Sequence, residues 1–346
     1  MSAARYGHDA ATLLEGVRLG DAIAMARAIT AIENQTAVGC ELGLTLDGQR
    51  AACRTIGVTG PPGAGKSSLI NALMPGLLPR YQRIGVLTVD PSSPVSGGAV
   101  LGDRVRMAAH SANPDVFIRS LASRGHLGGV TRTTRAVIEL LAAGGMDLVI
   151  VETVGTGQSE VEVAQLTDLK LVVCAPGLGD EMQAIKAGVL EIADLLVVNK
   201  ADLPDAERTM MHLKAMLGHR GHDERRTALK VSSMRGEGLT ALVDAIAARL
   251  SQPPRVQPGD AGRGEHPLFR LAEDVAALAA AMVRDASDPR LDALAAAVAS
   301  GALSRCDGGL AALRLLTGFE PASTAGQAAN EKLLGGIEEA GPCSVM

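Results

Sequence analysis

The segment that most constrains the fold of this chain is residues 60–67, whose sequence is GPPGAGKS. It fits the pattern G-x-x-x-x-G-K-[ST], in which glycines let backbone N–H groups point inward around phosphates at the start of a helix. The apolar run at residues 54–59 predicts a buried strand before this loop, and residues 68–73 have helical apolar spacing after it. A strand, a glycine-rich loop and a helix in this order favour an α/β fold with a phosphate-binding loop.

The side chains of this loop suit a nucleotide with a metal ion. Lys66 supplies a positive charge to the β- and γ-phosphates, and the Ser67 hydroxyl is the type of oxygen that binds Mg²⁺. The alternative is a glycine-rich turn with a chance Lys-Ser pair, and the strand and helix on either side argue against it. The residues expected to contact the nucleotide here are Gly60, Pro62, Gly63, Ala64, Gly65, Lys66, Ser67 and Ser68.

A second motif, at residues 199–202 with the sequence NKAD, bears on the choice of base, because the phosphate loop alone leaves ATP and GTP open. It follows the apolar run 194–198 and is therefore expected at the carboxyl edge of a sheet, where α/β folds bind ligands. The Asp202 carboxylate can accept two hydrogen bonds from guanine, whereas adenine has no such donor pair on that edge. Alone, this tetrapeptide is more typical of a surface turn. The expected base-side residues are Asn199, Lys200, Asp202, Ser232, Ser233 and Met234.

Three acidic residues lie between the two motifs. Asp90 and Glu152 are each expected at the end of a strand, and Asp103 in a loop. Carboxylates near a phosphate loop bind the metal directly or through water, so the predicted metal-site residues are Ser67, Asp90, Asp103 and Glu152. Gly155 would let a loop bring its backbone N–H to a γ-phosphate. The alternative for the acids is that they only cap strands or helices.

Composition excludes several classes of protein. A net charge of −5 argues against a nucleic-acid partner. The apolar stretch at residues 22–32 is interrupted by Arg27, so we expect no signal peptide, no membrane partner and a cytoplasmic protein. The five cysteines form no C-x-x-C pair, which argues against structural zinc. Because there is no Trp and there are only two Tyr and three Phe, the core must consist mainly of Ala, Leu, Val and Ile.

The organisation of the 346 residues is predicted as follows. Residues 1–52 form a helical extension, with Asp21 capping its second helix. Residues 53–250 form the phosphate-loop domain, a mostly parallel sheet with helices on both faces. Residues 251–264 are a Pro- and Gly-rich linker, 265–316 a helical arm, and 317–346 a tail without periodicity. The expected strands are 55–59, 83–89, 116–119, 148–152, 169–175, 195–199 and 229–232.

The ordered series of motifs resembles the MeaB/ArgK-type GTPases among the P-loop proteins. The resemblance rests on residues 60–67, 90–93, 97–107, 123–129, 152–160, 179–188 and 199–202. It extends from the helical extension to about residue 316. It implies a GTPase that uses GTP, GDP and Mg²⁺. It also implies that this GTPase is a chaperone of adenosylcobalamin-dependent acyl-CoA mutases and a metallochaperone for cobalamin. Such a protein gates cofactor loading and protects or reactivates the mutase.

The resemblance also implies roles for individual residues. Lys66 and Glu152 would take part in hydrolysis, and Gly155 would sense the γ-phosphate. Residues 177–188 resemble a further switch that faces the mutase, with Asp180, Gln183 and Lys186 as its polar members. Lys186 would supply positive charge when the partner orders that loop, and hydrolysis without the partner would be slow. The alternative is a loop before an amphipathic helix whose Lys is solvated.

Several functional alternatives remain open from the sequence. The served mutase could take methylmalonyl-CoA, isobutyryl-CoA or 2-hydroxyisobutyryl-CoA. A nickel-insertion GTPase is a second possibility, weakened by the absence of a His-rich or clustered-Cys tract. A kinase for a small molecule or a protein is a third, and an interaction module with a structural nucleotide is a fourth. The Ala-rich helices of the arm suit a homodimer, although they could also pack on their own subunit.

Overall fold

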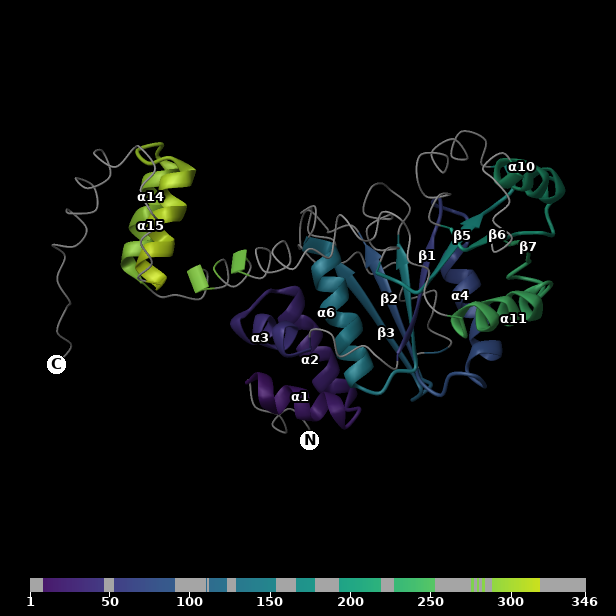
Figure 1. The fold of residues 1–346 in the computed structure, drawn as a ribbon, viewed down its shortest axis with the longest axis horizontal. Helices are drawn as coiled ribbons and strands as arrows, with labels where there is room; N and C mark the ends of the chain where they lie inside the picture. Colours follow the sequence, from purple (N-terminus) through teal and green to yellow (C-terminus); the bar gives the residue numbers. More distant parts are fainter. Residues whose placement is uncertain are drawn as a thin grey trace. The chain divides into compact units, whose positions relative to one another are not determined.

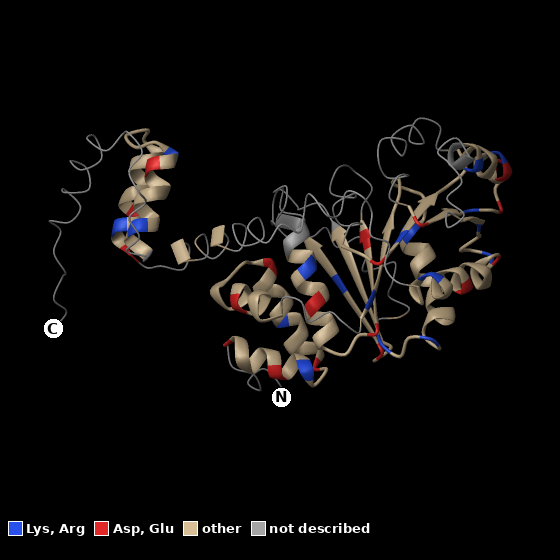
Figure 2. Cartoon of the chain, viewed as in Figure 1, with Lys and Arg blue, Asp and Glu red and all other residues tan. Residues whose placement is uncertain are grey.

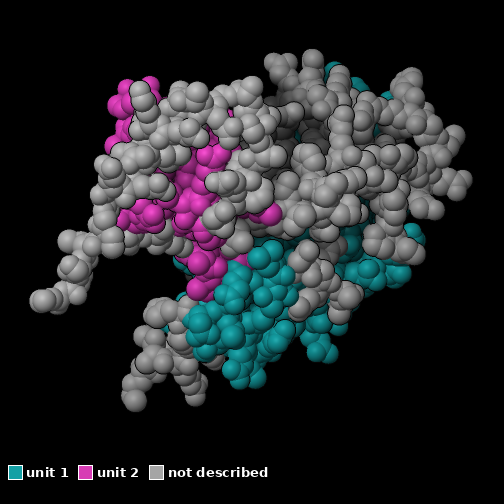
Figure 3. Space-filling model, turned by 60° about the vertical axis from the view of Figure 1, so that its left-hand side comes forward, with its two compact units in different colours: residues 1–34, 41–258 teal, residues 35–40, 259–346 magenta. Residues whose placement is uncertain are grey.

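The fold is described from a computed structural model. It describes residues 9–46, 53–90, 110, 112–122, 129–153, 166–177, 193–218, 227–252, 275–276, 279, 282–283 and 288–317. The chain divides into two compact units, one of residues 1–34 with 41–258 and one of residues 35–40 with 259–346 (Figure 3).

The described part of the first unit contains a parallel sheet of seven strands in the order β3-β2-β4-β1-β5-β6-β7 (Figure 1). Every neighbouring pair is parallel, which confirms the expected sheet. The carboxyl ends of all seven strands therefore lie at one edge. The strands are β1 (Arg54–Thr59), β2 (Ile84–Asp90), β3 (Val116–Ala122), β4 (Leu148–Thr153), β5 (Leu169–Cys174), β6 (Leu195–Val198) and β7 (Thr227–Lys230).

Burial of the strands explains their composition. Every residue of β4, β5 and β6 is buried, and five of the six residues of β1 are buried. A strand covered on both faces needs a nearly continuous run of apolar side chains, and its β-branched residues pack well on the pleated surface. Within these strands, β6 carries no charged residue and each of the other six carries one. Figure 2 shows how the charged residues are distributed over the strands and helices.

Helices cover both faces of the sheet, as expected. On one face, α4 (Lys66–Leu77) and α11 (Leu239–Leu250) pack together and against the central strands. On the other face, α10 (Ala206–Gly218) packs on β5 and β6, and α6 (Gly129–Ala143) packs on β4. This arrangement leaves the loop between β1 and α4 at the carboxyl edge of the sheet.

The N-terminal helices form a further layer on α6. Helix α1 (Ala10–Arg18) is capped by Asp9, whose side chain accepts from the Thr12 amide at 2.8 Å. Helix α2 (Ala22–Glu33) is capped by Asp21, which accepts from the amides of Ile23 and Ala24 at 2.8 and 2.9 Å, as the sequence predicts. Helix α2 also contacts the edge strand β3.

A third helix of the extension, α3 (Ala37–Leu46), was not predicted as a separate element. Its sequence, AVGCELGLTL, contains two glycines and a Thr, which have low helix propensity. Within the first unit, a Cβ atom on Gly43 would lie 3.8 Å from the Cβ atom of Ala136 on α6. That distance is an ordinary van der Waals contact, so packing does not require the glycine. Leu42 and Leu46 are completely buried, so burial of apolar side chains stabilises this helix despite its low local propensity.

The position expected for the last strand was wrong by two residues, because β7 spans Thr227–Lys230 and not residues 229–232. Beyond Lys230 the chain leaves the sheet. The Ser232 amide donates to the Glu237 carbonyl at 2.9 Å, and the two residues form an antiparallel bridge. Ser232 is thus part of a tight turn that begins at the carboxyl edge.

In the second unit the described residues include two helices, α14 (Pro289–Ala299) and α15 (Arg305–Thr317). They pack through a small core of Leu291, Leu294 and Ala311. Asp288 caps α14 by accepting from the Arg290 amide at 2.9 Å. No described helix combines the length and the apolar character needed to cross a membrane.

Candidate nucleotide-binding site

The loop from Gly60 to Gly65 depends on glycine at particular positions. Gly60, Gly63 and Gly65 have φ angles of 140°, 74° and 86°, which side-chain-bearing residues rarely adopt. A Cβ atom on Gly60 would lie 2.0 Å from the Val173 carbonyl oxygen of β5. A Cβ atom on Gly65 would lie 2.5 Å from Nδ2 of Asn199. The loop is therefore held close to the carboxyl ends of neighbouring strands by contacts that only glycine permits.

The N-terminus of α4 faces this loop. Gly65 is the N-cap of the helix, in the left-handed conformation, and no side chain caps it. Helix N-termini carry a partial positive charge and N–H groups without intrahelical partners. A helix start of this kind, preceded by glycines, suits an anion such as phosphate.

Lys66 is folded onto the loop in this structure. Its Nζ atom donates to the carbonyl oxygens of Gly60, at 2.8 Å, and Pro61, at 3.1 Å. The residue is 7% exposed. A positive charge is thus held inside the loop by two neutral acceptors, which phosphate oxygens can replace because charged acceptors bind an ammonium group more strongly.

Ser67 and Glu152 form the described part of the predicted metal site. The Ser67 hydroxyl donates to Oε1 of Glu152 at 2.7 Å, and both residues are buried. The strand register places Glu152 beside Val58 of β1, next to the phosphate loop. A hydroxyl and a carboxylate at hydrogen-bond distance are oxygen donors of the kind that Mg²⁺ takes, so this pair fits the metal.

Asp90 and Asp103 are the other two predicted metal-site residues. Asp90 is the last residue of β2, and its Cα partner on β3 is Ala122. Its side chain, and the whole of Asp103, lie outside the described residues. Within the described part of the chain, no three His, Cys, Asp or Glu side chains cluster as metal ligands would.

Asn199 connects the phosphate loop to the base-side segment. Its Nδ2 atom donates to the carbonyl oxygens of Ala64, at 3.0 Å, and Gly65, at 3.3 Å. Its Oδ1 atom accepts from the Ser233 hydroxyl at 2.8 Å and from the Ser233 amide at 3.2 Å. The side chain is almost completely buried. Both ends of the amide are used, so Asn199 holds the two halves of the site at a fixed distance.

Asp202 and Ser232 form a pair beside this connection. The Ser232 hydroxyl donates to Oδ1 of Asp202 at 2.6 Å and accepts from the Arg235 amide at 3.2 Å. The hydrogen bond from Ser232 is the main reason that the pKa of Asp202 lies below its usual value. Asp202 therefore remains an ionised acceptor to lower pH than an ordinary Asp. An ionised carboxylate has room for further donors besides one serine hydroxyl.

The remaining predicted residues are placed as follows. Lys200 adopts a left-handed conformation with φ of 57°. Met234 is 92% exposed in the turn after Ser233. Pro62 and Ser68 are exposed in the loop and on α4. The predicted residues outside the described part of the chain, besides Asp103, are Gly155, Asp180, Gln183 and Lys186.

Sequence reasoning missed one buried contact behind the loop. The Thr153 hydroxyl donates to the Thr59 hydroxyl at 3.0 Å, and both residues are buried at the carboxyl ends of β4 and β1. The pair joins the strand that ends at the phosphate loop to the strand that carries Glu152. The signal was available, since each Thr ends a buried strand, but its partner could not be identified without the sheet order.

Comparison with known proteins shows which family this chain resembles. A family model described as "Methylmalonyl Co-A mutase-associated GTPase MeaB" matches residues 25–255. A protein of Pyrococcus abyssi named as a GTPase is 45% identical over 205 residues, which are 59% of this chain and 63% of that protein. The "Methylmalonic aciduria type A homolog, mitochondrial" of Mus musculus is 41% identical over 197 residues, 55% of this chain and 48% of that protein. The chain thus spans less than two thirds of the length of these two relatives.

A solved structure, named "Crystal structure of LAO/AO transport system kinase", shares the fold. Its TM-score is 0.59 at 27% sequence identity, and the match covers 90% of this chain and 97% of that one. The family model covers more than half of this chain and includes both the phosphate loop and the base-side segment. The chain therefore belongs to the MeaB family.

Proposed function

We propose that this chain binds GTP with Mg²⁺, hydrolyses it, and acts as a chaperone of an adenosylcobalamin-dependent acyl-CoA mutase. The observation that supports this most directly is the position of Asn199. Its side chain contacts Ala64, which is 135 residues away in sequence, and also Ser233. These contacts support the proposal that the phosphate side and the base side form one site.

The base side favours guanine over adenine. The Asp202 carboxylate, oriented by Ser232, can accept from the N1–H and the exocyclic amine of guanine. Adenine would leave this carboxylate without donors, and a site built for hydrogen bonds rejects an analogue that lacks them. Lys200, Ser233 and Met234 would complete the surroundings of the base.

On the phosphate side, Lys66 would exchange its two carbonyl acceptors for phosphate oxygens. The first N–H groups of α4 would donate to the same phosphates. Ser67 and Glu152, together with Asp90 and Asp103, would hold Mg²⁺, which when bound neutralises part of the charge on the phosphates. Glu152 is also a candidate for orienting the groups that react.

The switch elements of the proposal come from the family resemblance. Gly155 would sense the γ-phosphate, and Asp180, Gln183 and Lys186 would face the partner. Lys186 would stabilise developing charge only when the partner orders its loop. This arrangement would make hydrolysis slow in the isolated chain and faster in the complex, as a switch requires.

The proposed partner follows from what the relatives are called. The family description names methylmalonyl-CoA mutase, and the mouse relative is named for methylmalonic aciduria. We propose that GTP hydrolysis here gates cobalamin loading, protection and reactivation of such a mutase in the cytoplasm. The helices α14 and α15 would mediate a homodimer.

The test is GTP turnover by the purified chain, with and without purified methylmalonyl-CoA mutase. We expect slow release of phosphate that the mutase accelerates, and a Lys66→Met variant should be inactive in both conditions. If GTP is bound but its turnover is the same with and without this mutase, the assignment of methylmalonyl-CoA mutase as the partner is wrong. If GTP is not bound, the whole proposal is wrong.

A kinase is the second candidate, because the solved structure with the shared fold is named as a transport-system kinase. A phosphate loop can transfer phosphate to an acceptor other than water. The same assay separates the two functions if the products are followed. Transfer of labelled phosphate to a small molecule or a protein, independent of the mutase, would favour the kinase.

A further inference from the structure

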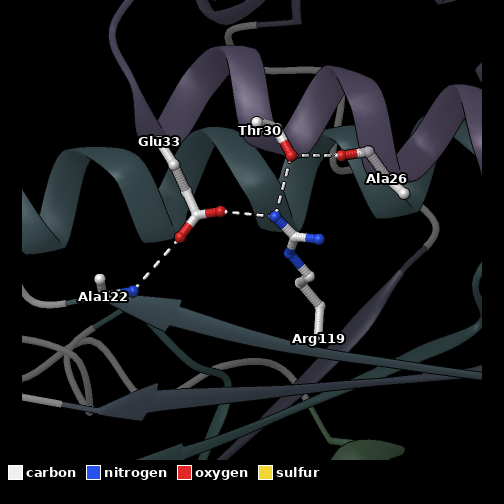
Figure 4. Close-up of polar contacts among 5 residues, drawn as sticks. All are labelled: Ala26, Thr30, Glu33, Arg119 and Ala122. Atoms are coloured by element: carbon white, nitrogen blue, oxygen red, sulfur yellow. Dashed lines mark hydrogen bonds and ion pairs between the residues drawn. The ribbon is translucent and has the colours of Figure 1, made fainter. Parts of the chain in front are cut away.

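A polar network joins helix α2 to the carboxyl end of the edge strand β3 (Figure 4). The Arg119 guanidinium donates from Nη2 to Oε2 of Glu33 at 2.8 Å and to the Thr30 hydroxyl at 2.9 Å. The other carboxylate oxygen of Glu33 accepts from the Ala122 amide at 3.2 Å. The Thr30 hydroxyl in turn donates to the Ala26 carbonyl at 2.9 Å. Glu33 therefore contacts both a charge and the backbone of β3.

The network is sheltered from solvent. The Glu33 side chain is 11% exposed and that of Arg119 is 28% exposed. Exposed surface ion pairs contribute little because water screens them, but a partly buried pair with additional hydrogen bonds fixes geometry more strongly. Replacing one partner also leaves the other charge poorly solvated.

The Ala122 amide matters because β3 is an edge strand of the described sheet. It pairs there only with β2, so the amides that point away from β2 need other acceptors. Glu33 supplies that acceptor at the last residue of the strand. The carboxylate thereby contacts the end of β3 through the Ala122 amide and the middle of β3 through the Arg119 side chain.

The carboxyl end of β3 is in register with the ends of β2 and β4 that carry the proposed metal ligands. Ala122 pairs with Asp90 on β2, and Thr88 of β2 pairs with Glu152 on β4. The Thr88 hydroxyl also donates to the Ser120 hydroxyl at 2.8 Å, which ties β2 to β3 across the ladder. A displacement of β3 at Ala122 would therefore also displace β2 at Asp90, because the ladder between β2 and β3 pairs these two residues.

We propose that Glu33 and Arg119 are positioning residues for the Mg²⁺ side of the nucleotide site. The inference rests on the proposed function, in which Asp90 and Glu152 help to hold the metal. Helix α2 then belongs to the machinery of the site, because it fixes the strand end that is paired with Asp90. The hydrogen bonds described above for this network include no residue of the phosphate loop or of the base side.

Two variants separate the parts of the contact. Glu33→Gln keeps an oxygen that can accept from the Ala122 amide but removes the charge opposite Arg119. Glu33→Leu keeps the approximate size and removes both interactions. Asp244→Asn is the matched control, since it removes the exposed ion pair of α11 with Arg80, which follows α4.

The measurements are made on the full chain. The first is the Mg²⁺ concentration that half-saturates the complex with fluorescent GDP. The second is GDP affinity in EDTA, and the third is amide hydrogen exchange at Ala122. Losing a group hydrogen-bonded to a metal ligand costs about 10–100-fold in metal affinity, and Glu33 acts one step further away. We therefore expect half-saturation to rise about 3-fold in Glu33→Gln and about 10-fold in Glu33→Leu.

GDP affinity in EDTA should be unchanged in both Glu33 variants. Amide exchange at Ala122 should be fastest in Glu33→Leu, intermediate in Glu33→Gln and slowest in the wild type. The inference is overturned if Mg²⁺ half-saturation matches that of Asp244→Asn while Ala122 exchange increases, since the contact would then be structural only. If Glu33→Leu does not fold, Glu33→Gln decides by the same criteria. If the wild-type chain binds no guanine nucleotide, the proposed function itself fails, and the inference fails with it.

Discussion

The contact between Gly65 and Asn199 allows a quantitative test of how the two halves of the site are joined. Gly65→Ala places a Cβ atom 2.5 Å from Nδ2 of Asn199, at a φ of 86°. A side-chain-bearing residue in the left-handed region costs about 1–2 kcal/mol. Displacing Asn199 sacrifices its hydrogen bonds to the loop, which contribute about 0.5–1.5 kcal/mol each. With two such hydrogen bonds, we expect a loss of about 2–5 kcal/mol in the free energy of unfolding.

Gly63→Ala is the matched control. Gly63 has a φ of 74°, but a Cβ atom there has no neighbour within 4 Å, so only the backbone cost of about 1–2 kcal/mol applies. The assay is urea unfolding of the nucleotide-free chain in EDTA, followed by far-UV circular dichroism because the sequence has no Trp. The difference between the two variants isolates the contact with Asn199.

A double variant makes the reasoning refutable. In an Asn199→Ala background the Nδ2 atom is absent, so Gly65→Ala should cost no more than Gly63→Ala does. Equal costs of the two glycine variants in the wild-type background would contradict the geometry. A large cost of Gly65→Ala that persists without Asn199 would show that the neighbour is not responsible.

Three further predictions concern individual side chains. In Ser232→Ala the pKa of Asp202 should rise toward its usual value, because the main hydrogen bond that lowers it is lost. When the pH is lowered toward about 4, the variant should therefore lose GDP affinity at a higher pH than the wild type does, which a titration of GDP binding against pH would measure. Burial raises the pKa of the Cys174 thiol to about 12, so Cys174 should resist a thiol reagent that modifies exposed Cys306, as peptide mapping would reveal. Glu152→Gln should weaken Mg²⁺ binding about 10–100-fold but leave GDP affinity in EDTA intact, which a metal titration would measure.

Local signals in the sequence were sufficient for much of the fold. Buried parallel strands require continuous apolar runs, so the strands from β1 to β6 could be located within a few residues. The cap at Asp21 follows from a side chain that satisfies helix N–H groups locally. The bounds of the last strand, within residues 227–232, were harder to predict, because the turn at Ser232 depends on its bridge to Glu237. The glycines of α3 likewise hid a helix that tertiary packing stabilises.

The candidate site shows the same division. The residue types of the phosphate loop and of Asp202 indicate their chemistry, because phosphates and guanine each need particular donors or acceptors. The double role of Asn199 could not be predicted, since it depends on which strands become neighbours in the sheet. The contact between Glu33 and Ala122 is still less accessible from sequence, because an edge-strand amide shows its partner only in the folded chain.

In the proposed function, the phosphate loop and the segment around Asp202 form one site that selects guanine. Competitive binding of GTP and ATP to the wild-type chain with Mg²⁺, with Asp202→Ala measured in parallel, is the decisive experiment. We expect GTP to bind at least about 100-fold more tightly than ATP, because ATP leaves the carboxylate without donors. Asp202→Ala should remove most of that preference. Equal affinities of the wild-type chain for GTP and ATP would refute guanine selection by this site.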